Sequence, residues 1–349
     1  MAAARRIAVV LFNLGGPDSA AAVEPFLFNL FNDPAIIGLP WPLRPLLARI
    51  IAGRRAATAR GIYAKIGNRS PILPNTEAQA NALAEQLGGF GETRVYCCMR
   101  YWHPMSPEVA AAVKSFAPDE IVLLPLYPQF SSTTTASSYR SWQAAAAAVD
   151  LRVPTKLICC YPTQPGFVAA AAALIRLGIT ECAAKTGKRF RVLFSAHGLP
   201  KKIVSRGDPY PSQVERSARA VAAALELADA DWTVCYQSRV GPLEWIGPDT
   251  DAEIRRAGRA GIGVVLFPIA FVSEHSETLV ELDMDYRHLA EQCGVAGYVR
   301  VPTVGTAPAF IAGLAELVRA ALASAAPVRS EGGPRLCAAG DACCVNRVA

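Results

Sequence analysis

The stretch that decides the fold reads Val192-Leu-Phe-Ser-Ala-His-Gly-Leu-Pro200, and Gly207-Asp-Pro-Tyr210 follows after a short gap. Its apolar first half predicts a buried strand of a parallel sheet. His197, Gly198 and Pro200 then end the strand and open a loop. In an open α/β sheet, ligands bind at the carboxyl ends of strands, so His197 is placed where such a fold carries out chemistry. A lone histidine more often has a structural role than a catalytic one. Evidence from other parts of the sequence is needed to choose between these two roles.

The composition is that of a two-domain α/β protein. Of its 349 residues, 52% are hydrophobic and 18% are charged, which is enough apolar material for two cores. A net charge of +6 without a Lys/Arg block argues against nucleic-acid binding. No stretch reaches the ~18 consecutive apolar residues of a membrane span. The N-terminus lacks the features of a secretory signal. We therefore expect a cytoplasmic protein.

Apolar runs and alanine-rich segments alternate along the chain. We expect strands at 7–15, 94–100, 120–127, 156–161, 191–197, 232–238, 261–271 and 298–304. We expect helices at 76–87, 106–116, 166–184, 211–228 and 308–323. This alternation is typical of parallel sheets with helices on both faces. Eight strands in two groups predict two similar domains, 1–155 and 156–326, followed by a tail at 327–349.

The segment 34–52 is apolar, rich in proline, carries Trp41 and contains only two charged residues, both arginines. So many prolines are incompatible with a core helix. Within about 34–55 we therefore expect an exposed apolar edge, either the lip of a pocket or a membrane-surface patch. Arg54 and Arg55 follow at once. Taken alone they indicate a solvated surface pair, but beside an apolar rim they suit a ligand with an apolar body and carboxylate tails.

Aromatic, cationic and hydroxyl side chains follow several predicted strands. The segment 99–104 holds a cation and three rings, and 127–138 is rich in hydroxyls. The segment 237–248 includes Trp245, which is suited to stacking on a flat ligand. Side chains of these kinds at several strand ends together are suited to lining a large pocket for a flat ligand. The loop 13–18 forms either a tight turn or a ligand-lining loop, and it lacks the full G-x-G-x-x-G pattern of a dinucleotide site.

A line of carboxylates is the strongest chemical signal after His197. Glu277, Glu281 and Asp285 stand at i, i+4 and i+8, so on an α-helix they share one face. Like charges at this spacing cost ~0.2–0.5 kcal/mol per pair, which favours a compensating role. Binding a metal ion or sharing protons would be such a role, because either one relieves the repulsion between the carboxylates. The structural alternative is a solvated acidic face near a helix N-terminus. His275 is a further candidate, with a capping or packing role as its alternative.

The tail beyond Ala326 is polar and contains Gly and Pro, so we do not expect it to fold by packing alone. It carries Cys337, Cys343 and Cys344 in a C-x5-C-C arrangement. In a reducing compartment, cysteines favour metal ligation over disulfides. A [2Fe–2S] cluster held by thiolates alone takes four of them, so a fourth ligand has to come from the body of the chain. Zinc and a tail without any ligand are the alternatives.

The segment 194–200, together with 207–210, resembles the signature motif of the ferrochelatase family. Further matches follow in the family's order, at Asn13-Leu-Gly-Gly-Pro17, Arg100-Tyr101, Tyr127-Pro-Gln129, Gln237-Ser238, Gly241-Pro242, Trp245, Gly247-Pro248 and His275-x-Glu277-Thr278-Leu279. The resemblance covers about 7–325. It implies a chelatase-like α/β fold of two Rossmann-like domains, each with a parallel β-sheet flanked by helices, and a porphyrin cleft between them. It also implies the insertion of Fe²⁺ into protoporphyrin IX, the last step of haem synthesis, without a nucleotide cofactor.

The resemblance assigns roles to individual residues. His197 and Glu277 match the family's active-site histidine and its partner acid, and are expected to assist metal delivery and pyrrole deprotonation. A neutral imidazole accepts a proton near neutral pH, and whether His197 mainly takes protons or binds iron stays open. Glu281 continues the line as a proton or metal conduit. The expected porphyrin-binding residues are Asn13, Arg54, Arg55, Tyr63, Ser70, Arg100, Tyr101, Ser131, Trp245, Phe271 and His275.

Two further expectations come from the resemblance. The segment 34–55 is similar to the family's active-site lip, which touches the membrane, so we expect a peripheral membrane protein. The tail is similar to that of cluster-bearing bacterial members. The animal members' internal cysteine is absent from 131–135, so one of Cys159 or Cys160 is expected to complete a [2Fe–2S] cluster with the three tail cysteines. Such relatives suggest a homodimer. The alternatives are a coproporphyrin III ferrochelatase, a cobalt chelatase, and a non-catalytic porphyrin- or haem-binding Fe–S protein.

Overall fold

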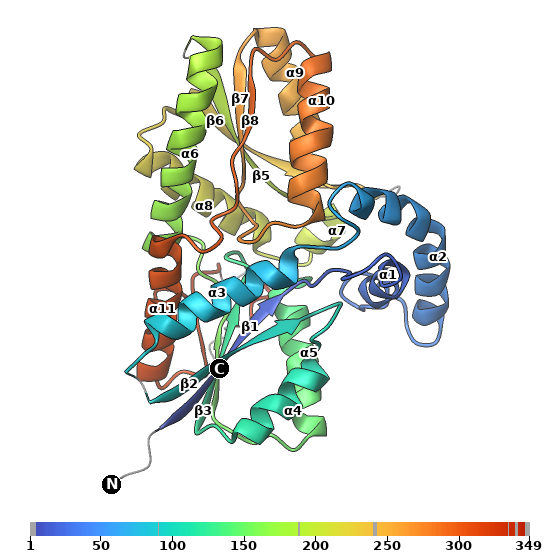
Figure 1. Cartoon of the computed structure of the whole chain (residues 1–349), viewed down its shortest axis with the longest axis vertical. Coiled ribbons are helices and arrows are strands. Elements are labelled where there is room, and N and C mark those ends of the chain that lie inside the picture. The colour runs from blue at the N-terminus through green and yellow to red at the C-terminus, as the bar shows by residue number, and fades with distance from the viewer. Residues whose placement is uncertain are drawn as a thin grey trace. The chain divides into compact units, whose positions relative to one another are not determined.

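The computed structural model describes residues 5–89, 91–187, 189–239, 243–333, 335–338 and 341–345 (Figure 1). Contacts divide these residues into two compact units. The first unit takes those up to 160, those within 314–336, and Val345; the second takes those within 161–313 and 337–344. The expected domains 1–155 and 156–326, with the tail 327–349, stay predictions, because compactness alone does not test whether each part folds by itself.

The first unit is built on a five-stranded sheet in the order β2-β1-β3-β4-β9, with all neighbouring strands parallel. Its strands are β1 (Arg6–Asn13), β2 (Glu92–Met99), β3 (Glu120–Pro125), β4 (Thr155–Ile158) and β9 (Val328–Arg329). The central strand β1 is fully buried from Ile7 to Phe12, as expected for a parallel strand covered on both faces.

The helices of this unit are α1 (Val23–Phe31), α2 (Leu43–Ala64), α3 (Ile72–Gln86), α4 (Ser106–Phe116) and α5 (Thr135–Ala148), while α11 (Pro308–Ala323) contributes residues to both units. Helices α3, α4 and α5 contact strands of the sheet, and α1 and α2 pack on each other beside it (Figure 1). Phe116 of α4 and Trp142 of α5 pack with Phe12 in one core cluster. The two helices lie on the same side of the sheet (Figure 1). A second cluster joins α1 and α2 through Phe26, Ala52 and other apolar side chains. The carboxyl ends of the strands remain available for loops that bear function.

The segment 34–55 is exposed, as predicted. Trp41, Leu43 and Leu46 are 77%, 55% and 62% exposed. Its prolines do not exclude a helix, because α2 begins at Leu43 with Pro42 as its N-cap and Pro45 in its first turn. The missing proline N–H is not needed at those positions. The segment therefore leads into a surface helix, and its apolar side chains stay in contact with solvent.

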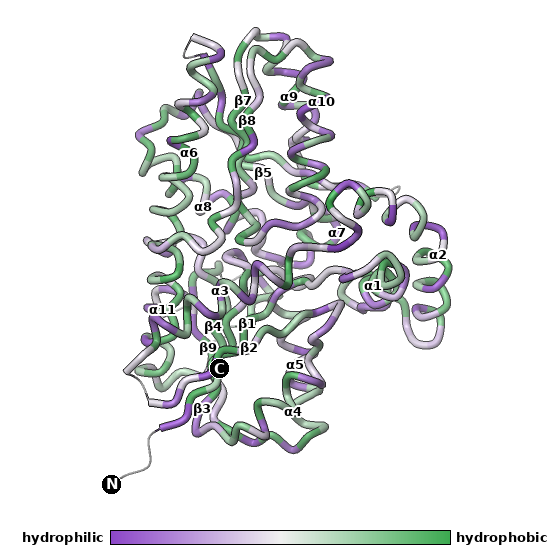
Figure 2. The backbone as a smooth tube through the Cα atoms, viewed as in Figure 1, coloured by the Kyte–Doolittle hydropathy of each residue, from purple (hydrophilic) through white to green (hydrophobic). Residues whose placement is uncertain are grey.

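The second unit holds a four-stranded parallel sheet in the order β6-β5-β7-β8. Its strands are β5 (Phe190–His197), β6 (Trp232–Gln237), β7 (Gly263–Pro268) and β8 (Tyr298–Arg300). Its helices are α6 (Pro165–Thr186), α7 (Lys201–Val204), α8 (Tyr210–Ala224), α9 (Thr250–Ala260) and α10 (Tyr286–Gln292), with a 3₁₀ turn at Asp229–Asp231 and a π-helix at Glu277–Asp285. Strands β5 and β7 are strongly hydrophobic (Figure 2). All eight predicted strands and all five predicted helices are therefore present.

One helix of the described residues, α6, is long and apolar enough to cross a membrane by length and composition alone. Ala171, Ile175 and Cys182 on this helix are fully buried. A Cβ added to Gly178 would lie 2.7 Å from the Val301 side chain, so the helix packs closely against its own unit. These contacts are those of a core helix.

Candidate functional site

His197 is the last residue of β5 and pairs in register with Gln237 at the end of β6. Its Nδ1 lies 2.7 Å from the carbonyl oxygen of Gly198, a contact that requires a proton on Nδ1. In the neutral ring, Nε2 then carries the lone pair. Nε2 lies 3.7 Å from Oε1 of Glu277, which is too long for a direct hydrogen bond. The strand end thus presents a proton-accepting nitrogen beside a carboxylate.

Glu277 is the first residue of the π-helix and lies between two imidazoles. Its Oε2 is 3.6 Å from Nε2 of His275, and its side chain is 29% exposed. Burial acts to raise the pKa of Glu277, but the neighbouring His197 and His275 outweigh it and lower this pKa to about 2. Glu277 is therefore a permanent anion at physiological pH. Within the described residues, Glu277 Oε2 and His275 Nε2 are buried without a hydrogen-bond partner, so neither atom's hydrogen-bonding capacity is used by the protein.

Glu281 lies further along the π-helix and is held by three donors. The Ser238 backbone N–H donates to its Oε1 at 2.9 Å, the Ser238 hydroxyl donates to Oε2, and the Tyr286 hydroxyl donates to Oε1 at 3.2 Å. Burial and the charge of Glu277 nevertheless raise the pKa of Glu281. Two neighbouring carboxyl groups thus have pKa values shifted in opposite directions. Such a pair is the arrangement that separates a fixed anion from a group that exchanges protons.

The helix that carries these acids is a π-helix, which corrects the α-helix that the spacing predicts. A π-helix is rare and is frequently found at functional sites. Leu282 packs into the core of the second unit and fixes the helix to the sheet. Glu277 and Glu281 do come together, but Asp285 is exposed at the helix end. The third member of the predicted line is therefore a surface residue.

Phe271, His275 and Trp245 lie in the same unit as His197. The rings of Phe271 and His275 are inclined by 47° with their centroids 4.4 Å apart, and His275 is buried. A Cβ added to Gly198 would lie 3.2 Å from the Trp245 ring, so this aromatic side chain packs against the loop beside His197. The glycine allows this close approach. Three predicted porphyrin-binding residues thus accompany the His197–Glu277 pair.

The other eight predicted porphyrin-binding residues belong to the first unit: Asn13, Arg54, Arg55, Tyr63, Ser70, Arg100, Tyr101 and Ser131. Arg54 and Arg55 are exposed on α2. Asn13 donates from Nδ2 to Thr76 Oγ1 at 2.9 Å. Asn13 is buried, and so are Tyr63, Ser70, Tyr101 and Ser131. Arg100 is partly buried.

Arg100 and Tyr101 meet the buried carboxylate of Asp33. The Arg100 guanidinium forms an ion pair with Asp33 at 2.8 Å, and the Tyr101 hydroxyl donates to the same oxygen at 2.8 Å. Arg100 also donates to Ser137 at 2.8 Å, and Ser137 in turn donates to Asp33. This buried cluster ties the start of the segment 34–55 to the end of β2. Their expected contact with porphyrin stays a prediction.

The cysteines have distinct surroundings. Cys159 and Cys160 lie buried just after β4 in the first unit, with their sulfurs 3.6 Å apart. The three tail cysteines belong to the second unit. Gln213 Nε2 lies 3.2 Å from the Cys337 sulfur, and the Cys343 N–H donates to the Gly207 carbonyl. Across the described ranges, no three His, Cys, Asp or Glu side chains are arranged to hold a metal ion. As placed, the cysteines do not form a cluster-binding group.

Sequence reasoning missed two residues that shape the site. Tyr286 was not singled out, although it donates to Glu281. Arg300 of β8 is nearly buried and pairs with Glu274 at 2.6 Å and with Asp283 at 3.3 Å. This ion-pair network fixes the loop before the π-helix to its middle. An Arg near the end of a strand was the only signal available for it.

Sequence comparisons with known proteins identify one family. A family model described as Ferrochelatase matches residues 6–322. The ferrochelatase of Phenylobacterium zucineum (strain HLK1) is 53% identical over 98% of this chain and 98% of its own length. That of Caulobacter vibrioides (strain NA1000 / CB15N) is 54% identical over 90% of each chain. Among solved structures, SirB from Bacillus subtilis with Fe³⁺ has a TM-score of 0.52 at 10% identity, covering 91% of this chain and 96% of its own. That likeness is one of fold alone.

Proposed function

The chain belongs to the ferrochelatase family, and from this premise we propose that its porphyrin substrate is protoporphyrin IX, with His197 and Glu277 assisting metal delivery and pyrrole deprotonation. The enzyme inserts iron into a porphyrin for haem synthesis. The apolar surface of the segment 34–55 supports protoporphyrin IX over coproporphyrin III, because the latter carries more carboxylates. The product is then protohaem.

The pair of carboxyl groups beside His197 carries the proposal. Two pyrrole N–H protons have to leave as Fe²⁺ enters the ring, so the site has to accept two protons. The lone pair of His197 Nε2 is suited to accept one. The Glu277 carboxylate, 3.7 Å away, stabilises the resulting imidazolium. Glu281, whose pKa is raised, is suited to hold a proton and pass it on.

The same residues suit the approach of Fe²⁺ as substrate. Imidazole nitrogens and carboxylate oxygens are ligands that Fe²⁺ accepts. Glu277 Oε2 and His275 Nε2 are buried side by side at 3.6 Å. A divalent cation between them would relieve their missing hydrogen bonds. Glu277 is therefore proposed to hold the incoming metal, while His197 takes the proton.

The experiment that tests this function is metal insertion into protoporphyrin IX and coproporphyrin III side by side, with Fe²⁺, Co²⁺ and Zn²⁺. We expect the highest kcat/KM with protoporphyrin IX and Fe²⁺. Higher kcat/KM with coproporphyrin III would assign the enzyme to that substrate instead. Faster insertion of Co²⁺ than of Fe²⁺ would indicate a cobalt chelatase. Tight porphyrin binding without turnover would indicate a non-catalytic carrier.

Replacing Ser238 with alanine should move the acid limb of the pH–kcat profile for metal insertion. Losing the hydroxyl removes a hydrogen bond to the charged form of Glu281, so the pKa of Glu281 rises further. The carboxyl group then stays protonated up to a higher pH, so the loss of activity on the acid side begins at a higher pH than in the wild type. The profile is measured by the rate of Zn²⁺ insertion from acidic to neutral pH.

Ser238→Gly is the matched variant, because Ser238 has a left-handed φ of 60° that glycine adopts without strain. It keeps the backbone donor and loses only the hydroxyl, so it should show the same shift as the alanine variant with no loss of stability. An unshifted acid limb in both variants would remove Glu281 from the proton path.

We further propose that the tail cysteines bind a [2Fe–2S] cluster together with Cys159 or Cys160. The support is the C-x5-C-C pattern of Cys337, Cys343 and Cys344, and no catalytic step depends on it. Anaerobically purified protein should absorb in the visible range and contain iron. Either Cys159→Ala or Cys160→Ala, but not both, should remove this absorption. Colourless protein loaded with zinc would contradict the cluster.

The cellular setting is part of the same proposal: a cytoplasmic enzyme that attaches peripherally to a membrane and forms a homodimer. The exposed apolar residues of the segment 34–55 support the membrane contact. Sedimentation with lipid vesicles tests it, and light scattering of the purified chain tests the dimer. Protein that stays in the supernatant at all lipid concentrations would contradict the membrane contact.

A further inference from the structure

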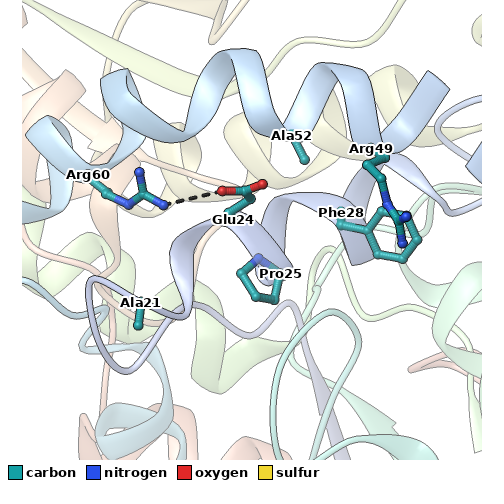
Figure 3. A pocket seen from close by; sticks show the side chains of 7 residues that line it. All are labelled: Ala21, Glu24, Pro25, Phe28, Arg49, Ala52 and Arg60. Carbon is teal, nitrogen blue, oxygen red and sulfur yellow. Dashed lines mark hydrogen bonds and ion pairs between the residues drawn. The ribbon is translucent and has the colours of Figure 1, made fainter. Parts of the chain in front are cut away.

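A cavity of about 420 Å³ opens between α1 and α2 in the first unit (Figure 3). It is lined by Ala21, Glu24, Pro25, Phe28, Arg49, Ala52 and Arg60. None of these residues is among the predicted metal- or porphyrin-binding residues, although Arg49 and Ala52 lie in the segment 34–55. The volume lies within the range of small-molecule pockets. The cavity is therefore a candidate binding site with a role of its own.

The cavity is lined by more positively charged side chains than negatively charged ones. Arg60 pairs with Glu24 at 3.4 Å, and Figure 3 shows this pair at one end. Arg49, at the other end, has its guanidinium carbon 5.8 Å from the centre of the Phe28 ring. In the part of the chain that the structure describes, no carboxylate pairs with Arg49. The cavity thus keeps one uncompensated positive charge above an apolar floor, which favours an anion attached to an apolar body.

The helix around Arg49 narrows the class of ligand. From Leu43 to Ala64, α2 contains five arginines and no acidic residue. Leu46 and Ile50 lie one turn apart on the same side of Arg49, and they are 62% and 44% exposed. A basic helix with exposed apolar side chains is typical of binding at an anionic membrane surface. A soluble anion would leave this apolar row without a partner, whereas the acyl chains of a lipid would cover it.

We propose that the cavity between α1 and α2 binds the headgroup of an anionic phospholipid. The phosphate contacts Arg49, the glycerol region lies on Phe28 and Pro25, and the acyl chains lie along Leu46 and Ile50. This inference rests on the proposed membrane contact of the segment 34–55. It adds that the membrane contact favours anionic lipid headgroups and that the headgroup binds in a defined cavity.

The test is sedimentation of the full chain with vesicles of phosphatidylcholine, alone or mixed with phosphatidylglycerol. Arg49→Gln should weaken binding to the mixed vesicles roughly 10–100-fold, the range expected when a hydrogen-bonded ion contact is lost. Arg44→Gln is the matched control. Arg44 is on the same helix, donates to the Leu39 carbonyl at 3.0 Å and lies outside the cavity. It should lose only about fivefold, the effect of one surface charge.

A second variant tests the cavity without changing its charge. Ala21 lies exposed at the rim, so Ala21→Phe fills the cavity and leaves the core intact. It should reduce the preference for phosphatidylglycerol over phosphatidylcholine about as much as Arg49→Gln does. Ala21→Phe should insert metal into detergent-dispersed porphyrin at the wild-type rate, because Ala21 lies outside the segment 34–55 and is not a proposed catalytic or porphyrin-binding residue.

Each contrary outcome has a separate meaning. Equal wild-type binding to both kinds of vesicle overturns the headgroup site and leaves the apolar membrane contact standing. Equal losses in the Arg49 and Arg44 variants overturn it in favour of diffuse attraction. Competition by glycerol 3-phosphate as strongly as by dispersed phosphatidylglycerol assigns the cavity to a soluble phosphate and overturns the lipid. Absence of binding to any vesicle removes both the site and the membrane contact.

Discussion

Replacing His197 with alanine is expected to lower kcat for iron insertion by ~10²–10⁴-fold, the usual contribution of a general base. His197 ends β5 with Nδ1 occupied by the Gly198 carbonyl, so Nε2 is its only free proton acceptor. No other imidazole in the described residues stands at this strand end. Initial rates of haem formation under anaerobic conditions measure the effect.

His288→Ala is the matched control, because this histidine lies on α10 with a side chain that is 70% exposed. It should keep the wild-type rate. Circular dichroism and thermal unfolding show whether His197→Ala remains folded, as we expect for a partly exposed side chain. Wild-type insertion by folded His197→Ala protein would refute its role as the base.

Glu277→Gln is expected to have the second largest effect, a loss of ~10²–10³-fold in kcat/KM for the metal. Glutamine keeps the shape of the side chain but removes the charge that faces His197 and the incoming Fe²⁺. The KM for Fe²⁺ should rise if the carboxylate holds the metal, while kcat alone should fall if it only stabilises the imidazolium. Steady-state kinetics over a range of Fe²⁺ concentrations separates these effects. Unchanged values of both parameters would exclude Glu277 from the site.

The same variant has a predicted signature in stability. The pKa of Glu277 is lowered from 4.5 to about 2 in the folded protein, so its ionised form stabilises the fold. This contribution is fully present above pH 4.5 and is lost as the pH falls towards 2. The difference in melting temperature between wild type and Glu277→Gln should therefore shrink across that interval. A difference that stays constant would mean that the carboxylate is not stabilised by its neighbours.

The sheets were predictable from sequence because buried parallel strands are nearly continuous apolar runs, as in Ile7 to Phe12. The strand β9 was not, because two residues at a sheet edge, Val328 and Arg329, carry no periodicity. The π-helix was also missed. Glu277 and Glu281 have the spacing of an α-helix, and only tertiary contacts such as the buried Leu282 decide the wider winding.

The candidate site was predictable only in part. His197 and Glu277 are 80 positions apart in the sequence, and no local pattern links them; the order of the family's motifs placed them together. Arg100 illustrates the limit. The family resemblance makes Arg100 a porphyrin-binding residue, which stays a prediction, and in the structure its guanidinium pairs with the protein's own Asp33. The position of an arginine in the sequence does not show which carboxylate its guanidinium will pair with.

The buried cluster around Asp33 lowers the entropic cost of binding a large ligand at the segment 34–55. Arg100, Tyr101 and Ser137 hold this buried carboxylate and so fix the root of the segment 34–55 before any ligand arrives. The conformational entropy of that root is lost during folding, so binding does not have to order it again. The segment 34–55, proposed as the lip of the porphyrin site, therefore has a preorganised root and an exposed apolar edge. Its binding energy can go into contacts with the ligand instead of into ordering the chain.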